Sequence, residues 1–435
     1  MGETAAKIAN GQKSMPPLHR QVRWWILAML FFVTVINFVD RQALAVLGSD
    51  ITAEFKLSNT DFGTIVSWFR FGMLVGEFPM GMLMDRVGVR FGLAFAVLWW
   101  SVGNGLHAMA SSIWSFRIFR FWLGTGECGN YSGGNKIVAS WFPVRERAFA
   151  IGVFNSASMF GSFVAAFLII PIREHFGWRM GFLIPSLLGV LWVLVWWFVY
   201  RQPKDHPRLT EAEARHITSD VQTEISEAAP SNWQLLRLPQ TWGLMLCRFW
   251  VGPVVEFYLY WMPKYFHDVR GLSVKNSAYF NSVTFVFGDI GSIGGGIAAA
   301  WLLKKGMEVK SARRSTLLFG AVLCLLSFLV PLTGSVAVAI ALISLVLLGH
   351  TFLSANMFAS VSDVFPNSAV ARVTGLTGVA NGLSGMIFPI VTGMIVDRFS
   401  YLPVFFMAAL MPLVGVGLAL VTLKNYQRVD LYRER

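Results

Sequence analysis

Four charged residues in two otherwise apolar stretches have the clearest chemical potential in this chain. Asp40 and Arg41 end one apolar run, and Arg120 and Glu127 lie within another. A charge at the centre of a membrane-spanning helix costs about 2.5–3.5 kcal/mol on insertion scales. Such residues persist where they face a water-filled pathway or pair with one another. Their presence favours a polar route through a bilayer.

Their chemistry suits the binding of an anion and the exchange of protons. Arginine holds a carboxylate through two parallel hydrogen bonds, which suits Arg41 or Arg120 to an anionic substrate. A carboxyl group in a low-dielectric site is more easily protonated than one in water, which suits Asp40 or Glu127 to proton exchange. Arg120 and Glu127 share a helix face about 10 Å apart along the axis, and Asp40 and Arg41 diverge by about 100°. The alternative is a structural set of ion pairs between helices.

Composition places the chain in a membrane and excludes several classes of function. Of 435 residues, 55% are hydrophobic and only 14% are charged, whereas soluble proteins carry roughly a quarter charged residues. The net charge of +12 is explained by basic cytoplasmic loops, so no nucleic-acid partner is expected. No metal-ligand spacing, nucleotide-binding loop or hydrolase triad is present, so we expect no metal, no cofactor and no enzymatic activity.

Apolar runs of about 20 residues, the length that crosses a bilayer, predict twelve membrane-spanning helices. They cover residues 24–46, 61–83, 91–109, 113–138, 148–170, 180–200, 241–265, 277–303, 315–332, 336–362, 372–397 and 403–423. We therefore predict an all-α membrane protein with two pseudo-symmetric six-helix bundles, 24–200 and 241–423, a linker at 201–240, and tails at 1–23 and 424–435. Lys and Arg are concentrated in the tails, the linker and the loops on their side, which places both termini in the cytoplasm.

A loop motif is expected on the cytoplasmic side between the second and third helices. In GMLMDRVGVR, Gly81 would let helices approach closely, Asp85 can cap or pair across the loop, and Arg86 and Arg90 hold the loop in the cytosol. The segment is either a gating latch or an ordinary basic loop. A similar segment, GMIVDR (393–398), is expected on the opposite side and is interpreted as a coincidental match.

Other polar residues within the predicted helices are candidates for contact with substrate. A group of aromatic and amide residues could bind hydroxyl groups and a sugar ring, although packing or an interfacial belt is the alternative. The group is Tyr258, Trp261, Asn155, Asn356, Ser360 and Asn381, and the echo of GVFN (152–155) by GVAN (378–381) relates two of its members. Arg70 could attract an anion or pair with a nearby acid, and Glu256 adds an acid to the second half.

Six segments resemble one family of carriers. They are INFVDRQ (36–42), GECGNYSGGNK (126–136), WFPVRERAFAIGVFNSAS (141–158), the pattern YxxPxDHPxLxxxE after the sixth helix (200–213), FYLYWMPKYF (257–266) and FGDIGSIGG (287–295). They resemble the anion:cation symporter family of the major facilitator superfamily, above all the bacterial hexuronate and aldonate transporters. The resemblance implies the major facilitator fold, a monomer in the bacterial inner membrane, and proton-driven import of an anionic sugar acid by alternating access.

The resemblance also implies roles for individual residues. Asp40 and Glu127 would be the protonatable pair, Arg41 and Arg120 the arginines of helices 1 and 4, and Asn381 an amide that contacts sugar hydroxyls. A carrier or exchanger of another organic anion, such as an aldarate, an aromatic acid or a dicarboxylic acid, is the alternative. A membrane enzyme or a transporter-like receptor is disfavoured, since the roughly 40-residue central loop is short for a domain.

Three residues depart from the family pattern, and one of them, Ser132, stands in helix 4 where relatives usually have proline. Arg70 is an extra charge in helix 2, and Glu256 stands where an aromatic residue is typical. Together they either change the preferred sugar acid or form a compensating pair.

Overall fold

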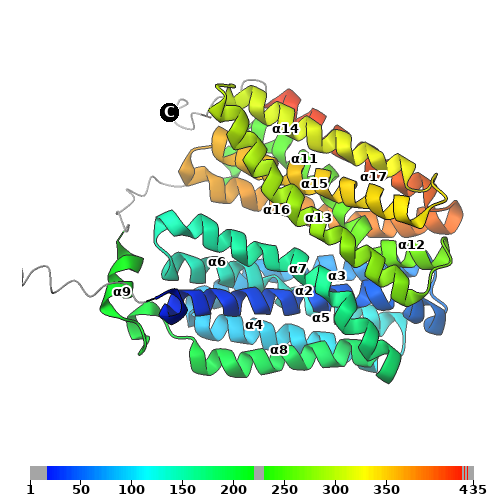
Figure 1. The fold of residues 1–435 in the computed structure, drawn as a ribbon, viewed down its shortest axis with the longest axis horizontal. Coiled ribbons are helices and arrows are strands. Elements are labelled where there is room, and N and C mark those ends of the chain that lie inside the picture. The colour runs from blue at the N-terminus through cyan, green and yellow to red at the C-terminus, as the bar shows by residue number, and fades with distance from the viewer. Residues whose placement is uncertain (1–16, 220–229, 424–425, 427–428, 430–435) are drawn as a thin grey trace, which may run out of the picture.

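The computed structural model describes residues 17–219, 230–423, 426 and 429, and all of its regular elements are helices. The predicted terminal tails lie largely outside these residues. Figure 1 shows the elements η1 (Leu18–Arg20), α2 (Val22–Phe55), α3 (Asn59–Val87), α4 (Val89–Leu106), η2 (His107–Met109), α5 (Ile113–Glu127), α6 (Gly129–Trp141), α7 (Val144–Phe176), α8 (Met180–Val199), η3 (Pro203–Asp205), α9 (Glu211–Thr218), α10 (Asn232–Leu236), α11 (Pro239–Tyr260), α12 (Met262–Asp268), α13 (Val274–Lys304), α14 (Val309–Cys324), η4 (Leu325–Leu329), α15 (Val336–Val364), α16 (Asn367–Arg398) and α17 (Leu402–Thr422).

The helical class is confirmed. When α5 and α6, and likewise α11 and α12, are taken as single broken helices, the described residues form twelve long helical segments. By length and composition, eight helices in the described part of the chain are apolar enough to cross a membrane. The remaining segments are interrupted, shorter or more polar. The helix α3, for example, carries the charged residues Arg70, Glu77, Asp85 and Arg86.

Two predicted spans, 113–138 and 241–265, contain breaks. The first is interrupted at Cys128, between α5 and α6. The second is interrupted at Trp261, two residues before Pro263, because the proline ring has no N–H to bond the carbonyl four residues earlier and clashes with it. The breaks place Glu127 and Tyr260 at the last positions of their helices.

The first helix is longer than predicted. The apolar run indicated an end near residue 46, but α2 continues to Phe55 and ends at Lys56, whose φ of 51° is left-handed. The extra turns are stable because their polar side chains have partners: Asp50 accepts from the guanidinium of Arg173 in α7 at 2.7 Å. A local hydropathy pattern cannot show this partner, which lies 123 residues further along the chain.

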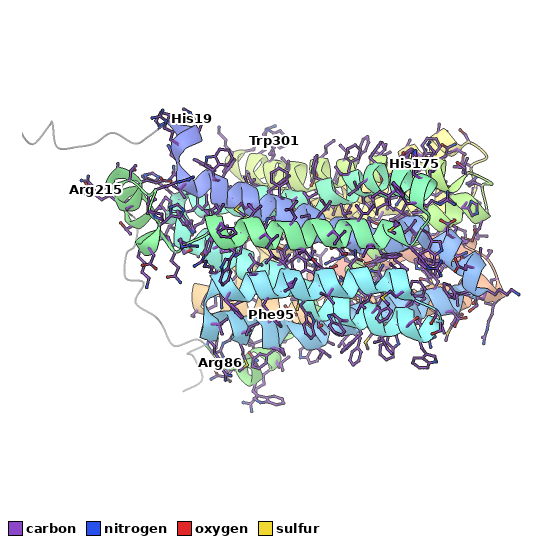
Figure 2. The ribbon with its side chains drawn as sticks, turned by 90° about the horizontal axis from the view of Figure 1, so that it is seen from below. His19, Arg86, Phe95, His175, Arg215 and Trp301 are labelled. Carbon is purple, nitrogen blue, oxygen red and sulfur yellow. The ribbon has the colours of Figure 1, made fainter. Side chains whose placement is uncertain are left out.

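The helices form two bundles. In Figure 1, α2–α8 make one layer and α11–α17 the other, with the short α9 beyond one end. Figure 2 shows His19, Arg86 and Arg215 towards that end and His175 towards the opposite one. The start of the described chain, the loop after α3 and the helix of the linker therefore share one end.

The helices α3 and α16 touch across the two bundles at one end and separate towards the other. A Cβ atom added at Gly393 would lie 2.4 Å from the Asn59 carbonyl oxygen. About three turns away, a Cβ at Gly382 would lie 3.5 Å from Leu74, and a Cβ at Gly81 would meet no atom within 4 Å. We call the end with Asn59 the closed end and the end with Gly81 the open end.

Candidate functional site

Two of the four predicted charges, Arg41 and Glu127, form an ion pair between α2 and α5. The Nε and Nη2 of Arg41 donate to the same Oε2 of Glu127 at 3.0 and 2.7 Å. Both side chains are almost fully buried, and the Arg41 guanidinium lies 4.4 Å from the centre of the Phe38 ring. The second carboxylate oxygen, Oε1, has no hydrogen-bond partner among the described residues. Glu127 can therefore accept a further hydrogen bond or a proton at that oxygen.

Arg120 is a buried cation without a hydrogen-bonding partner. Its side chain is fully buried, and none of its three guanidinium nitrogens has an acceptor within the described part of the chain. The guanidinium lies 5.9 Å from the centre of the Phe69 ring, and Glu127 and Asp40 act on it only through longer-range electrostatics. Arginine stays charged, and an unpaired buried charge is strongly destabilising. The arrangement suits an acceptor from outside the protein, such as a carboxylate.

Asp40 is directed to a different helix from its neighbour Arg41. One of its oxygens accepts a hydrogen bond from Nδ2 of Asn104 in α4 at 2.8 Å, and its other oxygen has no partner in the described residues. The same Nδ2 donates to the carbonyl of Phe182. This is the divergence expected for adjacent residues of one helix.

The four charges are shielded from solvent in this conformation. Asp40, Arg120 and Glu127 have no exposed surface, and Arg41 is 5% exposed. The expectation that they face a water-filled pathway is therefore not met here, whereas the expectation of pairing is met by Arg41 and Glu127 only. A solute can reach them only if helices move.

Arg70 and Glu256 form an ion pair across the two bundles. The Nε of Arg70 in α3 donates to Oε2 of Glu256 in α11 at 2.9 Å, and Nη2 contacts Oε1, so the contact is bidentate. Both side chains are largely buried. A Cβ at Gly385 of α16 would lie 3.2 Å from the Arg70 Nε, so a glycine leaves room for the guanidinium. Two of the three departures from the family pattern are thus partners.

Three of the predicted sugar-binding residues make contacts within the second bundle. The hydroxyl of Tyr258 donates to Ser327. Trp261 instead packs edge-on against Phe62 of α3, in the first bundle, at 5.3 Å between ring centres. Asn356 donates to the carbonyls of Gly295 and Phe352 and accepts from Arg313, and Ser360 donates to the Asn356 carbonyl. These bonds occupy the polar groups of Tyr258, Asn356 and Ser360.

The asparagines of the repeated segments GVFN and GVAN are less enclosed by their neighbours. Asn155 is exposed on α7, and Asn381 is half-buried on α16 beside Gly252, where an added Cβ would lie 1.9 Å from its Oδ1. Neither is joined by a direct contact to the arginines.

Tyr260 is a residue that sequence reasoning missed. It is buried, its hydroxyl has no hydrogen-bond partner in the described residues, and it interacts electrostatically with Arg41, Arg70 and Arg120. The prediction chose Tyr258 and Trp261 from the same aromatic segment. Pro263 could have drawn attention to Tyr260, because residues at helix breaks often line binding sites in carriers.

In the described part of the chain, the polar contacts of the predicted gating loop lie within its own bundle. Asp85 pairs with Lys136, Arg90 donates to the carbonyl of Trp197 at 2.5 Å, and Arg86 is exposed. No helix approaches Gly81, so the predicted close packing is absent in this conformation.

The segment interpreted as a coincidental match has a structural role. Asp397 accepts hydrogen bonds from the backbone N–H groups of Asn59 and Thr60 at 2.9 and 2.7 Å, and from both side chains at 2.9 and 2.6 Å. The carboxylate thus caps the N-terminus of α3 from the other bundle.

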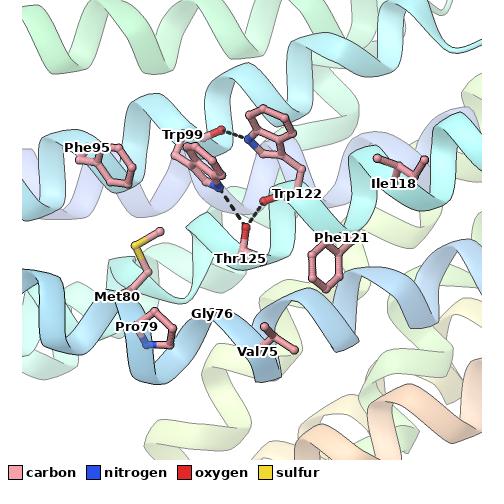
Figure 3. Close-up of a pocket in the computed structure, with 10 residues that line it drawn as sticks. All are labelled: Val75, Gly76, Pro79, Met80, Phe95, Trp99, Ile118, Phe121, Trp122 and Thr125. Atoms are coloured by element: carbon pink, nitrogen blue, oxygen red, sulfur yellow. Dashed lines mark hydrogen bonds between the residues drawn. The ribbon is translucent and has the colours of Figure 1, made fainter.

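One pocket differs from the charged site in having an apolar lining. It has a volume of about 300 Å³ and lies among α3, α4 and α5, where Trp122 donates to the Trp99 carbonyl and Trp99 to Thr125, as Figure 3 shows. None of its ten lining residues is charged, and Ile118 is 52% exposed. It is an apolar groove on the outside of the first bundle.

The family model for the major facilitator superfamily matches residues 30–345 and 307–431. The chain belongs to the major facilitator superfamily. It is a multi-pass membrane protein with the fold of that superfamily.

Among curated relatives, the chain is 28% identical to the hexuronate transporter of Escherichia coli (strain K12), with 95% of this chain and 96% of that protein covered. It is 29% identical to a probable galactarate/D-glucarate transporter of Bacillus subtilis, covering 86% of each. It is 26% identical to the D-galactonate transporter of Escherichia coli O6:H1, covering 94% and 97%. All three are transporters of this superfamily rather than enzymes.

Solved structures support the same fold. A bacterial homologue of the human lysosomal transporter Spinster, inward-facing and unoccupied, aligns with a TM-score of 0.70 and 19% identity over 93% of this chain and 96% of that one. The D-xylose-proton symporter aligns with a TM-score of 0.69 and 17% identity over 93% and 99%.

Proposed function

We propose that this carrier is a proton-coupled symporter that imports an anionic sugar acid by alternating access. The observation that carries the proposal is Arg120, a fully buried guanidinium with no acceptor among the described residues. A carboxylate fits its fork in size and charge. The relatives named hexuronate, galactonate and galactarate/D-glucarate transporters support a sugar acid as the source of that carboxylate.

Glu127 links substrate to proton in this proposal. In this structure its carboxylate holds Arg41. A proton on Glu127 would remove the charge that binds Arg41 and leave two guanidinium groups, those of Arg41 and Arg120, for one substrate carboxylate. Asp40, beside Asn104, is the second proposed proton acceptor. Release of substrate and protons on the other side would restore the Arg41–Glu127 pair and reset the carrier.

The side of release follows from the distribution of basic residues. The start of the described chain, the linker helix α9 and the loop after α3 lie at the open end, as Figure 2 shows, and Lys and Arg are frequent in these segments. The positive-inside rule therefore supports a cytoplasmic open end, cytoplasmic termini and an inner-membrane location. In this orientation the structure is closed towards the outside. Transport by a monomer remains part of the proposal.

Uptake by purified carrier in proteoliposomes tests the function. D-Glucuronate and D-galactonate should accumulate under an inwardly directed pH gradient, and gradient-insensitive uptake would exclude proton coupling. Glu127→Gln should lose concentrative uptake and keep counterflow exchange. The matched control is Glu77→Gln, an exposed carboxyl on α3, which should behave as wild type. Full accumulation by the Glu127 variant would remove that residue from the coupling role.

The arginine fork is tested by a change that keeps the charge. Arg120→Lys retains a cation and loses the bidentate geometry, so affinity should fall by about 30-fold or more, as hydrogen bonds to charged groups contribute about 1.5–3 kcal/mol each. Unchanged affinity would show that the substrate does not bind Arg120.

A further inference from the structure

We propose that Glu256 restricts this carrier to sugar acids with a single carboxylate. The inference rests on the proposed function, and it concerns the choice among the sugar acids named for the relatives, which include one- and two-carboxylate compounds.

Three arginines surround one region, and only one of them lacks an acceptor. Tyr260 is an electrostatic neighbour of Arg41, Arg70 and Arg120 alike. Arg41 is held by Glu127, and Arg70 by Glu256. Arg120 alone has no acceptor in the described residues, so the site offers one ready position for a carboxylate.

The second position is filled by the protein itself. Glu256 uses both carboxylate oxygens and Arg70 uses Nε and Nη2, which is the bidentate arrangement that a substrate carboxylate would otherwise adopt. The pair joins α3 of one bundle to α11 of the other, so it lies where a solute between the bundles would meet it. It is largely buried, with 13% and 6% of the two side chains exposed.

A second carboxylate on the substrate would therefore be disfavoured in either of two ways. If it displaced Glu256 from Arg70, a buried carboxylate would lose its partner, which is strongly destabilising. If it did not, two negative groups would face each other in a low-dielectric site. A distal hydroxyl or hemiacetal group has neither problem, because it can donate a hydrogen bond to Glu256. Selection against the wrong ligand by an unfavourable charge is a common source of specificity.

D-Glucuronate and D-glucarate give the sharpest comparison. They share the carbon skeleton and the configuration at C2–C5. At C1, D-glucuronate carries an aldehyde that closes to a ring hemiacetal, whereas D-glucarate carries a second carboxylate. Competition against labelled D-glucuronate uptake in proteoliposomes should show D-glucarate to be at least about 30-fold weaker than unlabelled D-glucuronate in wild type. Glu256→Gln keeps the shape, removes the charge and leaves Arg70 available, and it should narrow that ratio by about tenfold or more.

Two further variants separate specificity from stability. Glu77→Gln, a neutralised exposed carboxyl on α3, should leave the ratio unchanged. The exchange Arg70→Glu with Glu256→Arg keeps the pair and should keep the ratio near that of wild type. If Glu256→Gln weakens both compounds equally, the pair only holds the bundles together and the inference is wrong. If wild type takes up neither compound nor any sugar acid, the proposed function fails instead.

A second pocket supports an independent proposal: we infer that the open end of the first bundle binds an anionic phospholipid. The pocket has a volume of about 880 Å³, within the range of ligand sites. None of its lining residues is acidic, and its polar part contains Arg20, Arg201 and Arg208.

The pocket has an apolar wall that continues from this basic rim. Phe32 and Phe198 line it and are 60% and 77% exposed on the outer surface of α2 and α8. His206 also lines it, and burial, followed by the nearby Arg208, holds the pKa of that imidazole below its usual value. The positive charge at the rim is therefore supplied by the arginines. A phosphate head group on the arginines with acyl chains along the phenylalanines matches both parts, as in other basic pockets at membrane surfaces.

Lipid retention measures this site. Native mass spectrometry of the purified carrier, incubated with phosphatidylglycerol or with phosphatidylethanolamine, should show preferential retention of phosphatidylglycerol. Arg201→Gln with Arg208→Gln should reduce that retention by about tenfold. The control, Lys304→Gln with Lys305→Gln, removes two exposed charges from the second bundle at the same end. Equal loss in both variants, or no preference in wild type, would contradict a specific site.

Discussion

The open and closed ends of the α3–α16 pair carry similar sequence segments, but in the described residues only the segment at the closed end contacts the other bundle. GMLMDR (81–86) ends α3 and GMIVDR (393–398) ends α16, and the two helices are antiparallel. At the closed end, Gly393 packs against Asn59 and Asp397 caps the N-terminus of α3. At the open end, nothing approaches Gly81, and Asp85 contacts Lys136 of its own bundle.

The difference indicates how the carrier holds each end closed. A small residue lets the two backbones meet, and four residues later a carboxylate reaches the exposed N–H groups at the start of the partner helix, where the helix dipole favours negative charge. The same geometry is available to Gly81 and Asp85 at the N-terminus of α16. We therefore expect the two segments to engage alternately, one for each direction of access.

Bulky side chains at the two glycines should have the largest effects, in opposite directions. Gly393→Leu places atoms where the Asn59 carbonyl lies, since even a Cβ would be 2.4 Å away. It should disfavour the closed end by about 2 kcal/mol or more. Gly81→Leu should be accommodated, because an added Cβ at Gly81 has no described atom within 4 Å. It should therefore favour the conformation of this structure over one in which the open end is closed. Both should reduce transport at least about tenfold, because a cycle needs both states.

Glu174 of α7 and Lys275 of α13 contact each other across the two bundles at the closed end. The distance between spin labels at Glu174→Cys and Lys275→Cys therefore measures the state of that end directly. The three native cysteines are buried, so labelling should be selective. The distance should lengthen in Gly393→Leu and shorten or remain in Gly81→Leu. Similar distances in both variants would show that the two segments are not alternatives.

Removing the capping carboxylate should have an intermediate effect. Asp397→Ala loses the bonds to the N-terminus of α3, and loss of a helix cap costs about 1 kcal/mol. The closed end should therefore open in about fivefold more molecules. Asp85→Ala should act in the other direction. In this structure it loses only its contact with Lys136, whereas in the opposite conformation it would lose the expected cap on the N-terminus of α16. The same labelled distances decide between these signs, and a common sign for both variants would contradict the comparison.

Much of the fold could be predicted because long apolar runs are local features of the chain. The boundaries that were missed depend on distant partners or on breaks. The helix α2 continues through polar residues because Asp50 meets Arg173, and the break at Trp261 follows from Pro263. A hydropathy average over a window of residues shows neither the distant partner nor the break.

Sequence reasoning predicted which charges form the candidate site but not how they contact one another. The charges of the first bundle were found because a charge in an apolar run is conspicuous, but their contacts were not: spacing could not show that Glu127 pairs with Arg41 while Arg120 is left without an acceptor. In the second bundle, aromatic residues are common, and only the fold distinguishes Tyr260 from Tyr258. Asp397 was set aside because its partner, the start of α3, lies 337 residues away.

The exposed ion pair at the closed end should have the smallest effect. Lys275 contacts Glu174 across the bundles at 3.3 Å, with 47% and 37% of the two side chains exposed. Such pairs contribute about 0–1 kcal/mol and weaken with salt. At the middle of that range, about 0.5 kcal/mol, Lys275→Ala should shift the closed-end population about twofold, and less at high salt. Thiol labelling of a cysteine placed at Ser67 measures the shift, because Ser67 is buried on α3 one turn from Gly63, which packs against Pro389 of α16. A shift as large as that of Asp397→Ala would mean that surface charge, rather than helix capping, holds this end closed.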